Sequence, residues 1–223
     1  MIFFKNPEQR CSIIGLNLIF VMTNKRVRLE AASPTQPKGF AELIADLGDG
    51  ENGFIGTPVQ TGKATLQEYL LQCCNMPDPS KVPHGFVPQT VFWALNAHGE
   101  AIGIVRLRHY LNDRLRLKGG HIGYYVRSDQ RGRGYGKQML RLALTELSAL
   151  GEKRALITPS SENIPSIRLI EANGGKLQDV VTDQETGAKN CRYWIDLVPQ
   201  QSPAGDDIEA ALRHLIELET EHS

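Results

Sequence analysis

The sequence predicts one mixed α/β domain with a strand–helix–strand crossover at its centre. Two observations support this. Apolar residues recur with either a period of two or helical spacing, and glycine- or proline-rich segments separate these patterns. In order, the patterns predict one strand, two helices, three strands, a helix, a strand, a helix and two strands. We expect this domain at 25–198, between an apolar extension at 1–24 and a linker with an amphipathic helix at 199–223.

The first part of the domain mixes strand, helix and loop patterns. Alternation of apolar and polar residues predicts a strand at 27–31. Helical spacing predicts a helix at 40–47, which is followed at once by glycines, and another at 63–74. Four prolines in residues 76–89 exclude a helix or a central strand there. They indicate a long loop of the kind that often borders a binding site.

A β-hairpin and a third strand follow this loop. The hairpin is predicted at 90–96 and 101–109, and the third strand at 121–127. A helix is then predicted at 136–150, with Gly151 at its end. Its buried face is predicted to hold Leu140, Ala143, Leu144, Leu147 and Leu150.

The last part of the domain completes the crossover and closes the sheet. A short apolar run at 154–158 predicts a strand that is buried on both faces. A second helix follows, with Pro165 suited to its first turn and Gly174 to its end. A closing hairpin is predicted at 176–183 and 189–198.

The two ends of the chain carry separate patterns. The apolar run at 11–22 is interrupted by Asn17 and is too short to span a bilayer. We expect an appendage that packs on the domain, and Met22 is an alternative natural start. Helical spacing at 208–222 predicts a helix that docks on its own domain, with dimerisation as the alternative. We therefore expect a monomer or a homodimer.

Composition excludes several classes of function. The 223 residues include 41% hydrophobic and 22% charged residues, with a formal net charge of zero, as in ordinary soluble domains. A global basic field for nucleic acid is absent. The four cysteines lack C-x-x-C spacing and the histidines do not cluster near them, so we expect no metal. We expect a cytoplasmic protein with no membrane or nucleic-acid partner.

A glycine loop lies between the third strand and the following helix. "RGRGYG" occupies 131–136 and lies where the first N–H groups of the helix have no intrahelical partner. Glycines let an anion approach the backbone closely, and the helix dipole favours negative charge there. The segment is therefore suited to bind a pyrophosphate. The site that we predict consists of Arg131, Gly132, Arg133, Gly134, Tyr135, Gly136 and Lys137.

Two familiar phosphate motifs do not fit this loop. A P-loop needs G-x-x-x-x-G-K-S/T, but Arg131 replaces its first glycine and Gln138 its hydroxyl residue. A dinucleotide fingerprint needs G-x-G-x-x-G and an acidic residue at the end of the next strand, and both are missing. The structural alternative is a glycine turn that only connects strand to helix. The neighbouring cations favour the functional interpretation.

At this point the sequence resembles the GNAT superfamily of N-acetyltransferases. "VRSDQRGRGYGKQML" is similar to the family's acyl-CoA motif R/Q-x-x-G-x-G/A, which Arg131, Gly134 and Gly136 match. "ENIPSIRLIEANGGKL" resembles the next motif of the family, which Asn163, Ser166, Leu169, Glu171 and Gly174 match. The resemblance covers roughly Arg26 to Val198.

The resemblance implies a fold and a set of binding residues. It implies a mostly antiparallel central sheet of about six to seven strands with a V-shaped splay and flanking helices, plus the C-terminal helix. It implies acetyl-CoA as co-substrate, with its pantetheine arm between the strands at 121–127 and 154–158. Asn163 and Ser166 would line one wall. Main-chain groups of Tyr125, Val126 and Arg127 would face the pantetheine and the thioester.

The implied reaction is direct attack of an amine on the thioester. Family members often carry a glutamate as base where this sequence has His121, and histidine can accept a proton at neutral pH. The alternative for His121 is a strand residue that only packs. Many members use a tyrosine as the acid for the thiolate, but Ile170 is found there. Either Tyr124 or Tyr193 substitutes for it, or the thiolate leaves unassisted.

Three functions are consistent with these patterns. The first is an acetyl-CoA-dependent N-acetyltransferase that acts on a primary amine of a small molecule or a protein. The second is a catalytically weak acyl-CoA sensor, which the missing tyrosine favours mildly. The third, a nucleotide-binding regulator, is disfavoured by the failed fingerprints. The acceptor is not readable from the sequence.

Overall fold

The structure is a computed structural model that describes residues 27–184 and 186–198. The predicted extension at 1–24, the alternative start at Met22 and the predicted C-terminal helix lie outside these residues.

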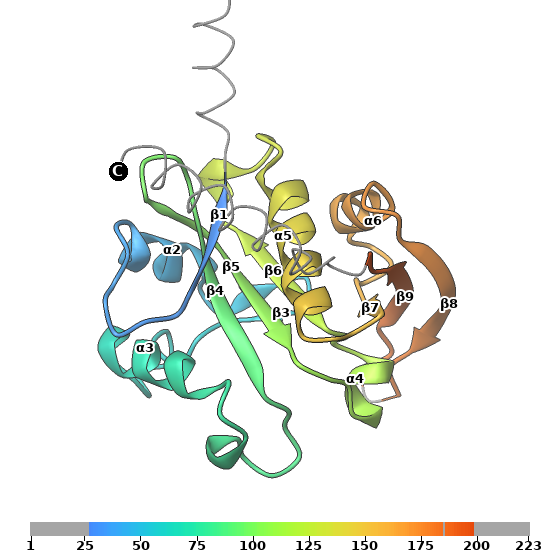
Figure 1. Cartoon of the computed structure of the whole chain (residues 1–223), viewed down its shortest axis with the longest axis horizontal. Helices are drawn as coiled ribbons and strands as arrows, with labels where there is room; N and C mark the ends of the chain where they lie inside the picture. Colours follow the sequence, from blue (N-terminus) through green and yellow to red (C-terminus); the bar gives the residue numbers. More distant parts are fainter. Residues whose placement is uncertain (1–26, 185, 199–223) are drawn as a thin grey trace, which may run out of the picture.

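The seven strands that the sequence predicts are present and antiparallel, but they form two sheets, whereas the resemblance implies one central sheet. The first sheet has the order β1-β4-β5-β6 and the second β7-β9-β8. The strands are β1 (Arg28–Ala31), β4 (Gln89–Leu95), β5 (Ala101–Arg108), β6 (Ile122–Val126), β7 (Arg154–Ile157), β8 (Lys176–Thr182) and β9 (Lys189–Asp196). Figure 1 shows the two sheets on either side of the central helix α5 (Tyr135–Ala149).

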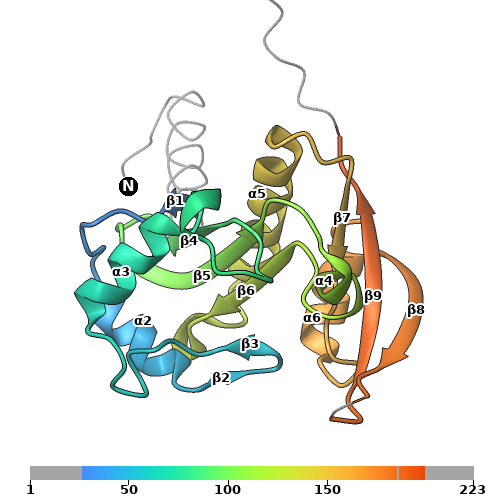
Figure 2. The same cartoon turned by 90° about the horizontal axis from the view of Figure 1, so that it is seen from below.

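Helices cover both faces of the first sheet. Helix α5 lies on one face, and α2 (Phe40–Leu47) and α3 (Leu66–Asn75) lie on the other (Figure 2). Helix α3 begins later than expected because the side chain of Thr65 accepts a hydrogen bond from the Glu68 N–H and completes a capping box. Helix α6 (Ile164–Glu171) follows β7 and has Asn163 as its N-cap.

Strand alternation builds two cores. Val91, Trp93 and Leu95 point to α2 and α3, whereas Phe92 and Ala94 point to α5, because successive residues of β4 face opposite sides. Trp93 is 1% exposed and meets the ring of Phe40 edge-on at 4.8 Å. The prediction that Leu150 is buried is wrong, since it is 50% exposed at the C-cap of α5.

Two elements were not predicted. A small hairpin of β2 (Gly50–Glu51) and β3 (Phe54–Ile55) follows α2 and reaches below β6 (Figure 2). A short helix, α4 (Asp113–Leu117), follows β5 with Asn112 as its N-cap. The proline-rich loop contains one 3₁₀ turn, Pro79–Lys81, and it does not line the large cavity described below.

In the described part of the chain, the edges of the two sheets meet at His121. Its main-chain N–H donates to the Leu156 carbonyl at 2.7 Å, and its ring Nδ1 accepts the Leu156 N–H at 2.9 Å. The ring therefore takes the place of a backbone carbonyl between the start of β6 and β7. Beyond this joint β6 and β7 belong to different sheets, so the expected splay is present and opens toward Val126.

His121 is neutral at ordinary pH. Burial, with smaller effects from the nearby guanidiniums of Arg116 and Arg108, lowers its pKa to about 4. Glu152 is the acid that faces the ring, with its carboxylate 3.9 Å from Nε2. Protonation of Nδ1 would remove the acceptor of the Leu156 N–H.

We predict that His121 makes the free energy of unfolding depend on pH. His121 is protonated near pH 6.5 in the unfolded chain but only near pH 4 in the folded chain. The free energy of unfolding therefore falls as pH decreases through this window. The expected loss is on the order of 2 kcal/mol between about pH 7 and about pH 4.5, measured by urea unfolding. His121→Asn keeps an acceptor but cannot titrate, and it should flatten the profile. His98→Asn, at an exposed position, is the control. An unchanged profile in His121→Asn would contradict the assignment.

Candidate functional site

A cavity of about 1020 Å³ lies where β6 and β7 diverge. Four parts of the chain line it: the β2–β3 hairpin, the exposed end of β5 with β6, the glycine loop with the start of α5, and residues 157–169 with the loop before β9. The cavity thus has the glycine loop on one side and the hairpin on the other. Its size is in the range of about 300–1,000 Å³ that is usual for small-molecule sites.

Six consecutive main-chain N–H groups are unpaired at the glycine loop. In the described part of the chain, no hydrogen bond is donated by the N–H groups of residues 132–137. The first one in this helix runs from Gln138 N–H to the Gly134 carbonyl at 3.4 Å. Unpaired N–H groups at a helix start, together with the helix dipole, are the arrangement that binds phosphate in proteins.

Glycines keep this loop open. Gly132 and Gly134 have φ angles of 73° and 81°, and a Cβ at either would meet nothing within 4 Å. Their left-handed conformation is the reason for glycine here, since other residues adopt it at a cost. Gly136 has a different reason, because a Cβ there would come within 2.7 Å of Leu169 Cδ1 in α6.

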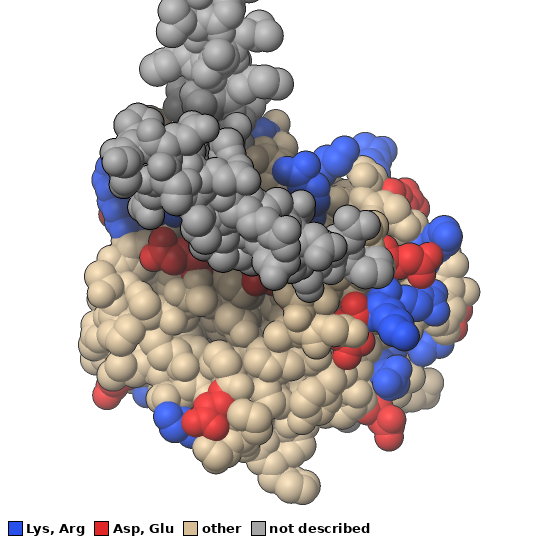
Figure 3. Space-filling view, viewed as in Figure 1, with Lys and Arg blue, Asp and Glu red and all other residues tan. Residues whose placement is uncertain are grey.

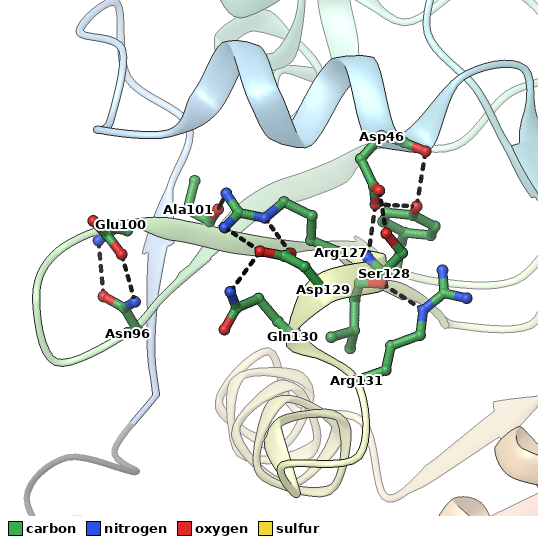
Figure 4. A network of polar contacts seen from close by, with 11 residues as sticks. Asp46, Asn96, Glu100, Ala101, Arg127, Ser128, Asp129, Gln130 and Arg131 are labelled. Atoms are coloured by element: carbon green, nitrogen blue, oxygen red, sulfur yellow. Dashed lines mark hydrogen bonds and ion pairs between the residues drawn. The ribbon is translucent and has the colours of Figure 1, made fainter.

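The segment before the loop is anchored to α2 by Asp46. Its carboxylate accepts hydrogen bonds from Tyr125 Oη at 2.6 Å and from the Ser128 N–H at 2.8 Å, and it also accepts one from the Ser128 hydroxyl (Figure 4). Burial alone would raise the pKa of Asp46, but the hydrogen bonds from Ser128 and Tyr125 outweigh it and hold the pKa below its usual range. Asp46 was not among the predicted site residues. Its position in the last turn of a predicted helix, where the helix dipole disfavours negative charge, is the sequence feature that could have indicated a specific role.

Arg131 links the loop to the β2–β3 hairpin. Its guanidinium pairs with the Glu51 carboxylate, and its Nε donates to the Val126 carbonyl at 3.0 Å. It also lies over the Tyr125 ring, 5.3 Å from the centroid. Both members of the ion pair are about two-fifths exposed, so an incoming anion can compete for Arg131.

Three residues were predicted to offer main-chain groups to the ligand, and Val126 is the one whose main-chain groups face the cavity. Arg127 N–H donates to the Ile102 carbonyl at 2.9 Å, so the main-chain groups of Arg127 and Tyr125 point toward β5. By alternation those of Val126 point to the open edge of β6. The side chain of Arg127 binds Asp129 and the Ala101 carbonyl and does not line the cavity (Figure 4).

Tyr124, Ser166 and Asn163 meet across the cavity. Tyr124 Oη lies 2.6 Å from Ser166 Oγ, and Asn163 Oδ1 accepts the Ser166 N–H at 3.2 Å as the cap of α6. Burial raises the pKa of Tyr124 to about 12, against a smaller opposite effect of Ser166. Tyr124 therefore stays protonated at neutral pH and can donate a proton or a hydrogen bond.

Three other predicted residues lie away from the cavity. His121 forms the joint between the sheets and does not line the cavity. Tyr193 is 4% exposed and donates to Glu171 at 3.0 Å, also outside the lining. Arg133 is exposed and does not line the cavity. We therefore leave His121 and Tyr193 out of the proposed chemistry. Ile170 is fully buried in the core, so no proton donor replaces the usual tyrosine at that position.

Two arginines of β5 line the end of the cavity near the hairpin. Arg106 donates to the Ile55 carbonyl at 2.9 Å and stacks on Phe54, with its Cζ 4.4 Å from the ring centroid. Arg108 donates to the carbonyls of Gly119 and Gly120 at 2.9 and 3.2 Å. Burial, with Arg106 and Arg114 nearby, lowers the pKa of Arg108 to about 10, so it is still charged at neutral pH.

A second, smaller cavity of about 480 Å³ is lined by Arg116, His121, Glu152 and Trp194. Acidic and basic side chains are mixed on the face shown in Figure 3. Within residues 27–184 and 186–198, no cluster of three or more metal-binding side chains occurs. The same residues include no helix with the length and apolar character needed to cross a membrane.

Comparison with known proteins identifies the class. The family model "Acetyltransferase (GNAT) domain" matches residues 29–176, which is more than half of the chain. The chain therefore belongs to the GNAT acetyltransferase family. A search of curated proteins finds no match.

Solved structures share the fold at low sequence identity. The yncA protein from Salmonella typhimurium, solved with its cofactor acetyl-CoA, has a TM-score of 0.53 and 14% identity, over 79% of this chain and 97% of that one. An acetyltransferase from Salmonella typhimurium that modifies the N-terminal serine of a ribosomal subunit protein has a TM-score of 0.56 and 14% identity, over 77% and 95%. A spermidine/spermine N-acetyltransferase from Vibrio cholerae has a TM-score of 0.53 and 16% identity, over 77% and 95%. These likenesses show the fold, and they span different acceptors.

Proposed function

We propose that this protein transfers an acetyl group from acetyl-CoA to a primary amine by direct attack in a ternary complex. The observation that carries the proposal is the row of six unpaired N–H groups at 132–137 at the edge of the cavity. A diphosphate supplies acceptors for such a row, and the loop has no Cβ in its way. Acetyl-CoA bound to the structural relative yncA supports this choice of substrate.

The cavity residues have distinct roles in this proposal. The N–H groups of 132–137, with Arg131 and Lys137, bind the diphosphate of acetyl-CoA. The pantetheine arm lies along the open edge of β6, where Arg131 Nε already holds the Val126 carbonyl, and Asn163 and Ser166 line the opposite wall. The arm would occupy the gap between β6 and β7, where no strand among the described residues pairs with the facing edge of either one.

The chemistry needs three events around the thioester carbonyl. The amine attacks as the neutral base, and negative charge develops on the carbonyl oxygen. The Val126 N–H, which points to the open edge of β6, is the proposed donor to that oxygen. As the C–S bond breaks, Tyr124 donates its phenolic proton to the thiolate. The ammonium formed by the attack loses its proton to water, and the Tyr124 phenolate regains a proton from water.

The direct test is an acetyl-CoA consumption assay over a panel of amines, preceded by mass spectrometry for copurified CoA. We expect CoA to bind and at least one amine to be acetylated. If CoA binds and no amine turns over, the chain is an acyl-CoA sensor instead. If CoA does not bind, the assignment of the loop is wrong.

We predict that Gly134→Asp lowers the affinity for CoA at least tenfold, measured by calorimetry. The new carboxylate lies among the N–H groups proposed for the diphosphate and repels it. Gly151→Asp is the matched control, because Gly151 also has a positive φ, 91°, with open space around it, but at the other end of α5. Equal losses in both variants would mean that the effect is structural.

We predict that Glu51→Gln raises the affinity for CoA by about two- to fivefold. The substitution frees Arg131 and removes a negative charge beside the loop, and an exposed ion pair of this kind is worth up to about 1 kcal/mol. Glu42→Gln, on exposed α2 surface, changes net charge equally and should have no effect. A decrease in affinity in Glu51→Gln would contradict the proposed role of Arg131.

We predict that Tyr124→Phe lowers kcat tenfold or more and leaves the affinity for CoA nearly unchanged. General acids of this type contribute on the order of 10²-fold or more. Since burial raises the pKa of Tyr124 to about 12, wild-type kcat should show no loss of this acid up to about pH 9. Tyr193→Phe is the matched control and should keep kcat. A full kcat in Tyr124→Phe would mean that the thiolate leaves unassisted.

A further inference from the structure

The end of the cavity near the hairpin carries two arginines without an acidic partner. Arg106 and Arg108 are two residues apart on β5, so both side chains leave the same face of the sheet. Each donates to main-chain carbonyls, and neither forms an ion pair with any acid in the described residues. A charged group that is partly buried in this way normally has a counter-charge.

The other cations of the cavity are accounted for differently. Arg131 pairs with Glu51, and Lys118 pairs with Asp183 at 2.7 Å. Lys137 and Arg168 belong to α5 and α6, on the side where the diphosphate is proposed. We therefore assign the positive charge of Arg106 and Arg108 to the end of the cavity where the acceptor amine would bind.

An unsatisfied amide lies in the same cavity. Asn190 is 6% exposed, lines the cavity from β9, and its Nδ2 has no hydrogen-bond partner in the described residues. Asn190 forms a β-bridge with Ser160. Thr158, two residues before Ser160, accepts the N–H of Gly119 through its hydroxyl, and the carbonyl of Gly119 accepts a hydrogen bond from Arg108. A buried amide without a partner costs free energy unless a ligand satisfies it.

We propose that the acceptor is an amine that also carries a carboxylate within a few bonds of it, and that Arg108 and Asn190 bind this carboxylate. The proposal rests on the acetyl-transfer function proposed above and narrows its acceptor. Arg108 uses Nη1 for the two glycine carbonyls, which leaves Nε and Nη2 for a carboxylate. Arg106 adds positive potential, and its guanidinium is held by Phe54 and the hairpin.

The same arrangement disfavours polyamines. Of the described residues that line the cavity, Glu51 and Glu162 are the acids, and Glu51 is paired with Arg131. A polyamine would bring several positive charges next to Arg106 and Arg108 with little acid to receive them. Like charges at this distance repel, whereas a carboxylate is attracted.

The test compares amino acids with their carboxamides as acceptors in the acetyl-CoA assay. The two differ in the carboxylate and in the pKa of the α-amine, which is lower in the carboxamide, so kcat/KM is compared per neutral amine at the assay pH. The comparison uses the unaltered protein. We expect kcat/KM to be about 10- to 100-fold higher for the amino acid of the best pair, as for one charge-assisted hydrogen-bonded contact. Short peptides with an acidic second residue form a separate arm, which distinguishes a peptide from a free amino acid as the source. Spermidine is the polyamine arm.

A substitution of Arg108 tests whether this residue causes the preference for a carboxylate. Arg108→Gln should reduce the preference for amino acid over carboxamide to within about twofold, and Arg108→Lys should restore part of it. Arg154→Gln, an exposed arginine outside the cavity, is the matched control. CoA affinity, measured in each variant, should stay at the wild-type value, which shows that Arg108→Gln is folded.

The outcomes separate this proposal from the proposed function. Transfer to amines without preference for a carboxylate, or a preference that persists in Arg108→Gln, overturns the acceptor class and leaves acetyl transfer intact. If no amine turns over, binding of N-acetyl amino acids against N-acetyl amino amides is measured by calorimetry with CoA present. Carboxylate-dependent binding there supports the proposal without the function, and its absence overturns both.

Discussion

The functional architecture depends on the joint between the two sheets at His121. Two hydrogen bonds to Leu156 hold β6 and β7 together at one end, and within residues 27–184 and 186–198 no strand continues the ladder beyond it. Because β6 then has an unpaired edge, its N–H and C=O groups need another partner. The cavity exists where that edge is open, and Val126 lies at its far end. A histidine ring can make this joint only while Nδ1 is unprotonated, which its burial ensures.

The glycine loop is a second place where main-chain groups are left without partners. Its N–H groups remain available because the segment before it is fastened elsewhere, by Asp46 through Ser128 and Tyr125. Without that anchor the loop could fold back on its own amides. Rigid support from α2 therefore keeps the N–H groups of the loop unpaired, which costs free energy. An anion that accepts hydrogen bonds from these groups recovers that free energy on binding.

The sequence predicted secondary structure and the glycine loop, but it did not predict which residues from distant segments lie together. The strands, α5 and the glycine loop follow from periodicity and from glycine positions within a few residues. The β2–β3 hairpin has strands of two residues each, which is too short for periodicity to detect. The resemblance suggested His121 as a base from its position along the strand, but position alone does not say that its ring turns to Leu156. Arg108 was not among the predicted site residues, because only the packing of Gly119 and Gly120 places its guanidinium at the cavity.

The absence of His121 from the cavity changes how the amine can be made reactive. An alkyl amine with a pKa near 10.4 is neutral in only about one molecule in 2,500 at pH 7. Each unit by which the site lowers that pKa increases the neutral fraction about tenfold, and both desolvation and a neighbouring cation lower it. Once a carboxylate of the acceptor has neutralised Arg108, the charge of Arg106 still acts on the ammonium from the same face of β5. The arginines that would select an anionic acceptor thus also favour its neutral amine, so that water is a sufficient proton acceptor and no side-chain base is required at the cavity.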